Sequence, residues 1–287
     1  MNDLYATITN KIIADLEQGV RPWTKPWTGN SGYIGLPLRH NKEPYHGINT
    51  LLLWQEAVER GYASPIWMTY NQAQTLKGQV RKGEHGCTVV YANTIIRQEE
   101  GSEDMKRIPF LRSYTVFNAD QITGLPEAYY AKSEETVPVP EKDARLEALF
   151  AATEAKVFHG GNRACYVIGR DEIHMPPFAA FPQPEGYWAT LAHEMTHWTR
   201  HPSRLDRDLG RKKWGDEGYA KEELVAELGS AFLCAALHIT PEIREDHSAY
   251  IESWLEVLKH DKRFIFSAAS QAQKAADYLQ AKMGEVK

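Results

Sequence analysis

Residues 187–200 are Tyr-Trp-Ala-Thr-Leu-Ala-His-Glu-Met-Thr-His-Trp-Thr-Arg, an apolar stretch that holds two histidines four positions apart. On an α-helix, residues i and i+4 lie on one face about 6 Å apart. The imidazoles of His193 and His197 can therefore reach one tetrahedral ion at about 2.0–2.1 Å. Glu194 projects beside them, where it can take a proton from metal-activated water. Because a buried imidazole without a partner is costly, we predict a divalent metal site. We expect Zn²⁺, with Mn²⁺ or another divalent ion as the alternative.

Two histidines leave a catalytic zinc one protein ligand short, and we expect the missing ligand in Lys-Glu-Glu-Leu-Val-Ala-Glu-Leu-Gly at residues 221–229. On a helix, Glu223 and Glu227 share a face, whereas Glu222 faces another side, where we expect solvent. The pattern E-x-x-A-[D/E] resembles the downstream helix of gluzincin-type metallopeptidases. That resemblance implies Glu223 as the third metal ligand and Glu227 as the carboxylate that orients a ligand histidine. The swapped assignment is the alternative.

The bulk composition excludes several classes of protein. The chain has 287 residues, enough for two hydrophobic cores, and its 43% hydrophobic content is ordinary for a globular protein. No stretch approaches the ~20 apolar residues of a membrane helix, and no secretory signal is apparent. The three cysteines are dispersed, which excludes a C-x-x-C zinc site, and we expect all of them to be buried. We expect a cytoplasmic protein with no membrane partner.

A polar segment with two closely spaced prolines, residues 131–142, predicts a linker between a domain at 1–130 and a domain at 143–287. Apolar periodicity predicts that both domains are α+β. In the first domain we expect helices at 4–16, 47–60 and 70–77 and strands at 87–97 and 110–117. In the second we expect a helix at 143–156, a hairpin at 164–176, and helices at 187–200, 219–237, 248–260 and 264–283.

The N-terminal part of the chain is rich in aromatic residues and modestly basic. Residues 1–98 carry a net charge of +3, which leaves −8 for the rest. Aromatic rings beside cations are typical of single-stranded nucleic-acid binding, where bases stack on the rings and cations follow the phosphates. Composition alone also allows an ordinary aromatic core with a solvated basic loop. The candidate DNA-binding residues are Trp23, Lys25, Trp27, Tyr45, Asn49, Trp67, Tyr70, Lys77, Arg81 and Lys82.

The order of several segments carries a more specific resemblance. Pro-Trp-x-x-Pro-Trp at 22–27, Pro-Tyr-His-Gly-Ile-Asn at 44–49 and Trp-Met-Thr-Tyr-Asn-Gln-Ala at 67–73 resemble the N-terminal domain of ArdC-type antirestriction proteins and of TraC plasmid primases. Residues 192–199 and 222–229 are similar to the metallopeptidase-like domain found with it. The resemblance implies a single-stranded-DNA-binding domain followed by a zincin-like, gluzincin-type fold. It also implies that the protein protects incoming plasmid DNA from host restriction during conjugation.

Our leading hypothesis is an antirestriction protein that binds single-stranded DNA and carries a zinc metallopeptidase-like domain, with Glu194 as the catalytic base. Whether the domain cleaves peptide bonds stays open at this point. One alternative is a metalloprotease whose N-terminal domain recognises a host protein. The other is a DNA-binding protein with a purely structural metal site.

Overall fold

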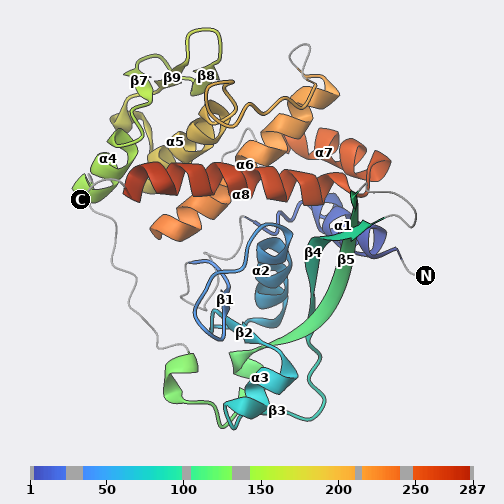
Figure 1. The fold of residues 1–287 in the computed structure, drawn as a ribbon. Helices are drawn as coiled ribbons and strands as arrows, with labels where there is room; N and C mark the ends of the chain where they lie inside the picture. The colour runs from blue at the N-terminus through green and yellow to red at the C-terminus, as the bar shows by residue number, and fades with distance from the viewer. Residues whose placement is uncertain are drawn as a thin grey trace. The chain divides into compact units, whose positions relative to one another are not determined.

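The computed structural model describes residues 3–23, 35–98, 105–130, 143–210, 215–239 and 248–284. The chain divides into two compact units, one formed by residues 1–36 with 133–287 and the other by residues 37–132 (Figure 1). Each unit combines helices with β-sheets, which confirms the expected α+β class. Among the described helices, none combines the length and apolar content that crossing a bilayer would require.

The N-terminal helix belongs to a different unit from the one that its place in the sequence suggested. Helix α1 (Leu4–Glu17) buries Ile8, Ile12 and Leu16 and packs against α7 (Ser248–His260). The Thr9 hydroxyl also donates a 2.6 Å hydrogen bond to the carbonyl of Lys262. An amphipathic helix needs an apolar partner, and α7 supplies it. The expected domain at 1–130 includes this helix, whereas the structure groups residues 1–36 with residues 133–287.

The unit of residues 37–132 is built around a long β-hairpin, β4 (Cys87–Gln98) and β5 (Met105–Asn118), with α2 (Ile48–Arg60) beside it (Figure 1). The two strands form the expected hairpin, with a register that runs from Cys87 opposite Val116 to Gln98 opposite Met105, and the second strand begins earlier than the expected residue 110. The four-stranded sheet has the order β1-β2-β5-β4 and a two-stranded sheet pairs β3 with β6. The other elements are β1 (Leu38–Arg39), β2 (Ile66–Met68), α3 (Tyr70–Thr75), β3 (Gln79–Val80) and β6 (Ile122–Thr123).

Helix α2 is fixed to the edge of this sheet by a side chain. The Asn49 amide donates to the Val90 carbonyl at 2.8 Å and accepts from the Val90 N–H at 2.8 Å. An edge strand such as β4 presents unpaired backbone groups, and Asn49 satisfies two of them. Further along the helix, the Cys87 thiol lies 3.9 Å from the Leu52 carbonyl. Helix α2 therefore covers part of one face of the hairpin, and the side chains there are buried.

The other unit pairs a small sheet with a group of helices. Strands β7 (Lys156–His159), β8 (Cys165–Val167) and β9 (Glu172–Met175) have the order β7-β9-β8, and β8 forms the predicted hairpin with β9. Helix α4 (Ala144–Ala151) is shorter than expected, because the chain has entered β7 by Lys156. Three further helices were expected close to these bounds: α5 (Pro184–Trp198), α6 (Glu217–Leu237) and α8 (Phe264–Gly284).

Helix α6 packs on both α5 and α8 and is buried along almost its whole length. It meets α5 at a residue with no side chain. A Cβ added at Gly229 would lie 2.5 Å from Cγ2 and 2.9 Å from Oγ1 of Thr196. Gly229 lies two turns beyond Glu222 on the same face of α6, and Thr196 lies between the two histidines of α5. The separation of the two helices is therefore set next to the residues of the candidate metal site.

We predict that Gly229→Ala lowers the free energy of unfolding by about 1–3 kcal/mol, because the new methyl group must push Thr196 away. Thermal or urea unfolding of the variant measures this loss. Thr196→Ala removes the two closest atoms, so the double variant Thr196→Ala/Gly229→Ala should recover much of the stability relative to Gly229→Ala. If the stability losses of the two single variants simply add in the double variant, this contact does not limit how closely α5 and α6 approach.

Candidate metal centre

The two histidines of α5 are buried side by side. His193 and His197 are 5% and 8% exposed, and their ring centroids are 4.8 Å apart. They lie one helical turn apart, as the spacing predicted, inside a helix whose residues from Gly186 to Trp198 are all buried. A buried imidazole needs a polar partner, and here the partners come from α6.

Glu223 of α6 faces both imidazoles at once. Its two carboxylate oxygens lie 3.5 Å from His193 Nε2 and 3.5 Å from His197 Nε2. Ligand atoms at about 2.0–2.1 Å from a tetrahedral ion are separated by about 3.4 Å. One potential ligand atom from each of the three residues lies within 4.8 Å of the others. Two imidazole nitrogens and a carboxylate oxygen in this geometry fit a divalent cation.

Glu222 is not solvated, contrary to expectation, but fully buried beside His197. Its Oε1 lies 3.1 Å from His197 Nδ1, and it accepts hydrogen bonds of 2.9 and 2.7 Å from Arg207. Burial would raise the pKa of Glu222, but the bonds from Arg207 and His197 lower it to about 2. With Nδ1 held by this carboxylate, His197 presents Nε2 to Glu223.

The same environment acts on His197. Burial lowers its pKa, but Glu223 and Glu222 outweigh that effect and raise the pKa to about 10. The pocket therefore strongly favours a cation between these carboxylates.

Glu227 lies on the other side of the site, with Oε2 3.8 Å from His193 Nδ1. Its Oε1 accepts from Arg21 Nη1 at 3.2 Å and from the Trp23 indole N–H at 3.3 Å. Arg21 and Glu227 are both almost fully buried, so the carboxylate is fixed from a part of the chain about 200 residues away. Each histidine thus has a carboxylate beside its Nδ1, Glu222 for one and Glu227 for the other.

Glu194 is 4% exposed on α5. Burial raises the pKa of the Cys165 thiol, and the Glu194 carboxylate raises it further. Glu194 therefore lies near β8, which is an edge strand of its sheet and contacts α5. Cys165 is exposed, whereas Cys87 and Cys234 are buried as expected.

Tyr219 borders the same site on α6. Burial raises the pKa of its hydroxyl, and Glu223 raises it further. The hydroxyl also lies 2.9 Å from that of Tyr250.

Four of the candidate DNA-binding residues have internal roles instead. Trp23, Tyr45 and Trp67 are 1%, 4% and 1% exposed, so their rings cannot stack on bases in this structure. The Asn49 amide is bonded to the backbone of β4. Large aromatic rings gain most from burial, which explains why the aromatic-rich composition was misleading. Tyr70, Lys77, Arg81 and Lys82 are exposed, and Lys25 and Trp27 lie outside the described residues.

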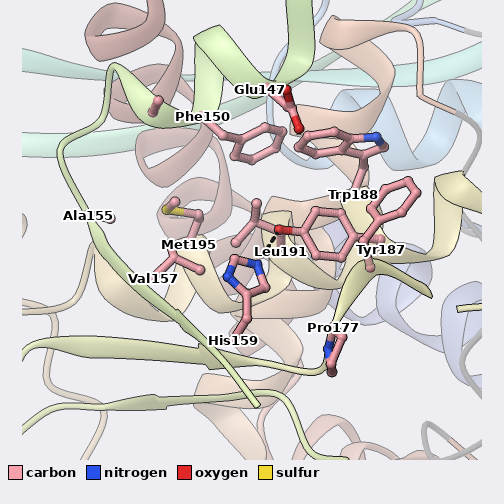
Figure 2. A pocket seen from close by; sticks show the side chains of 12 residues that line it. Glu147, Phe150, Ala155, Val157, His159, Pro177, Tyr187, Trp188, Leu191 and Met195 are labelled. Carbon is pink, nitrogen blue, oxygen red and sulfur yellow. Dashed lines mark hydrogen bonds between the residues drawn. The ribbon is translucent and has the colours of Figure 1, made fainter. Parts of the chain in front are cut away.

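A separate cavity of about 560 Å³ lies against the opposite face of α5 (Figure 2). Trp188, Leu191 and Met195 line it from α5, about half a helical turn away from the two histidines. The Tyr187 hydroxyl points toward His159 at 2.9 Å (Figure 2). None of the residues that line this cavity is a candidate metal ligand.

Comparison with known proteins identifies the family. The model of the N-terminal domain of anti-restriction factor ArdC matches residues 2–117, and that of a zincin-like metallopeptidase matches residues 144–271. The metal-free crystal structure of antirestriction protein ArdC from plasmid R388 is 50% identical, covers 99% of both chains and has a TM-score of 0.86. The chain belongs to the ArdC antirestriction family. A Mn(II)-bound structure of the R388 protein is 48% identical, covers 99% of this chain and 100% of that one, and has a TM-score of 0.84.

Other relatives extend the family. The y4eC protein of Sinorhizobium fredii is 40% identical over 99% of this chain and 93% of its own length. DNA primase TraC of Escherichia coli is 38% identical over 95% of this chain, which spans only 26% of that primase. The zincin-like family model, the Mn(II)-bound R388 structure and the donor geometry together imply that this chain has a zincin-like domain with a divalent metal site.

We predict that Glu223→Ala abolishes tight metal binding, whereas Glu227→Gln weakens it by about 10–100-fold, the usual effect of losing a partner of a ligand histidine. Competition with a chromophoric chelator measures both affinities. Glu217→Gln, an exposed glutamate on the same helix, is the matched control. Full metal occupancy in Glu223→Ala with none in Glu227→Gln would reverse the two assignments.

Proposed function

We propose that this chain is an antirestriction protein of conjugative plasmids that acts in the cytoplasm. Its unit at 37–132 binds single-stranded DNA. Its zincin-like unit holds a divalent metal, most simply Zn²⁺, through His193, His197 and Glu223. The observation that carries the proposal is the convergence of these three buried donors in a chain 50% identical to the R388 antirestriction protein. Protection of plasmid DNA entering a new host is the role that follows from that likeness.

The DNA-binding part of the proposal is supported by the charge of the chain. Residues 37–132 carry eleven Lys and Arg against ten Asp and Glu, a net charge of +1, so the −5 of the whole chain lies outside this unit, and anionic partners favour the less acidic surface. Within the unit at 37–132, Lys77, Arg81 and Lys82 are exposed around a tight turn that contains Gly83. Exposed lysines and arginines of this kind bind the phosphates of a nucleic acid and do not distinguish its base sequence.

The proposed chemistry of the zincin-like unit is peptide-bond hydrolysis of a host protein. A bound divalent ion would supply Lewis acidity to the substrate carbonyl. Glu194 would accept a proton as water attacks the carbonyl carbon, and would deliver it to the nitrogen as the C–N bond breaks. Glu222 is hydrogen-bonded to His197 Nδ1, Glu227 lies 3.8 Å from His193 Nδ1, and the Tyr219 hydroxyl would stabilise the oxyanion. The edge strand β8 beside Glu194 offers backbone groups with which an extended peptide can pair.

A second candidate function is DNA protection without hydrolysis, in which the metal only stabilises the fold. The burial of all three donors and of both supporting carboxylates favours it, because metal binding to such a site adds directly to folding free energy.

We predict that Glu194→Gln keeps its metal but loses any cleavage of host proteins, because the amide cannot accept the proton. Metal analysis and a cleavage assay on host lysate, followed by an antirestriction assay in cells, measure the three properties. Glu185→Gln, in the first turn of the same helix, is the control. If Glu194→Gln retains full antirestriction, hydrolysis is not needed for that role, and DNA protection without hydrolysis is the function that remains.

We predict that the full-length protein binds a fluorescent single-stranded oligonucleotide more tightly than the matching duplex. The logarithm of the affinity should fall linearly with the logarithm of the salt concentration, with a slope of about −0.7 per phosphate contacted. Fluorescence anisotropy across a salt series measures it. Absence of binding at low salt would remove the DNA-binding part of the proposal.

A further inference from the structure

The outer part of the β4–β5 hairpin carries exposed aromatic side chains that the sequence analysis did not single out. Residues directly opposite each other in an antiparallel pair project to the same face. Cys87 with Val116, Val89 with Tyr114, and Tyr91 with Arg112 therefore share one face. Cys87 and Val116 are buried where α2 covers this face. Beyond Asn49, near the start of α2, Tyr91 is 49% exposed and Tyr114 is 37% exposed.

Basic groups lie at the same place. Arg112 is exposed directly opposite Tyr91. The Arg39 guanidinium lies over the buried Tyr45 ring, 5.4 Å from its centroid. The Tyr45 carbonyl accepts from the Thr50 hydroxyl, and the neighbouring Asn49 is bonded to Val90 beside Tyr91, so Arg39 lies at the N-terminal end of α2 near the exposed tyrosines. We call Arg39, Tyr91, Arg112 and Tyr114 the hairpin cluster.

The chemistry of the hairpin cluster fits an unpaired nucleic-acid strand. Tyr91 and Tyr114 are diagonal neighbours on adjacent strands, about 7–8 Å apart between their Cα atoms. Exposed rings at that spacing offer faces on which unstacked bases can lie, and neighbouring arginines can follow the phosphates. Duplex DNA offers its phosphates but keeps its bases stacked in the helix. Two exposed tyrosines with exposed arginines close by therefore favour a single strand over other polyanions.

The basic turn, Lys77, Arg81 and Lys82, is a weaker candidate for base stacking. Residues 77–83 contain no aromatic side chain, and the exposed ring of Tyr70 comes seven residues before Lys77. Arg81 is bonded to Glu84 at 3.1 and 2.7 Å, and Arg39 of the hairpin cluster likewise lies 3.7 Å from a carboxylate oxygen of Glu43, so ion pairing does not separate the two surfaces. These residues fit a contact with phosphates alone.

We propose that Tyr91 and Tyr114 form the platform on which bases of single-stranded DNA stack, with Arg39 and Arg112 on the adjacent phosphates. This inference rests on the proposed single-stranded-DNA binding and assigns it to a surface.

The test is anisotropy titration of a fluorescent oligothymidylate with the full chain and its variants, across a salt series. Tyr91→Ala and Tyr114→Ala should each weaken binding by about fivefold or more with an unchanged salt slope. The phenylalanine variants should bind like the wild type, since the ring is kept. Arg112→Ala should reduce the magnitude of the slope by about 0.7. All three substituted positions are exposed, and thermal unfolding checks that each variant is folded.

Two control variants remove exposed side chains of the same kinds outside the hairpin cluster. Phe158→Ala removes an exposed aromatic residue from a strand of the other unit, and Arg60→Ala removes an exposed arginine at the far end of α2. Neither should change binding. If the wild type binds DNA but the tyrosine variants do so equally well, the inference is wrong while the proposed function stands. A loss confined to Tyr70→Ala and Lys82→Ala would move the platform to the basic turn. Failure of the wild type to bind would instead reject the proposed function itself.

Discussion

The close contact between α5 and α6 at Thr196 and Gly229 is the constraint on which the metal centre depends. A methyl group at position 229 would lie 2.5 Å from Thr196, so the helices can approach this closely only with glycine there. The approach places the Glu223 carboxylate 3.5 Å from both imidazole Nε2 atoms. A shift of an ångström at this crossing would spoil the tetrahedral spacing, because metal–ligand distances tolerate only about 0.2 Å.

Buried charge explains what surrounds the ligands. Glu222, Glu223 and Glu227 are all buried, and a buried carboxylate is tolerated only when it is paired and hydrogen-bonded. Arg207 pairs with Glu222 and also donates to the Thr196 carbonyl and Thr199 hydroxyl, so one guanidinium joins the end of α5 to α6. Arg21 and Trp23 perform the corresponding task for Glu227. The first 23 residues thus contribute to the metal centre although the family model for the zincin-like domain begins at residue 144.

The two units use their aromatic residues differently. In the unit at 37–132, Tyr45 and Trp67 belong to the core, and the exposed rings are on the hairpin and on α3. Sequence alone could not separate these groups, because burial of a given ring depends on which distant elements pack over it. Side chains of β4 and β5 alternate between the two faces of the hairpin. Which of them are exposed can be told only when the length of hairpin that α2 covers is known.

The sequence by itself determined the elements and the two histidines. Apolar periodicity placed α2, α5, α6, α7 and α8 within a few residues, and the i, i+4 spacing of His193 and His197 required a shared helical face. These are local properties of a helix. The tertiary structure alone decided that Glu222 is buried beside His197, that Arg207 and Arg21 hold the carboxylates, and that α1 belongs with α7. Those contacts join residues from 15 to 253 positions apart. Local periodicity carries no information about which distant side chain will neutralise a buried charge.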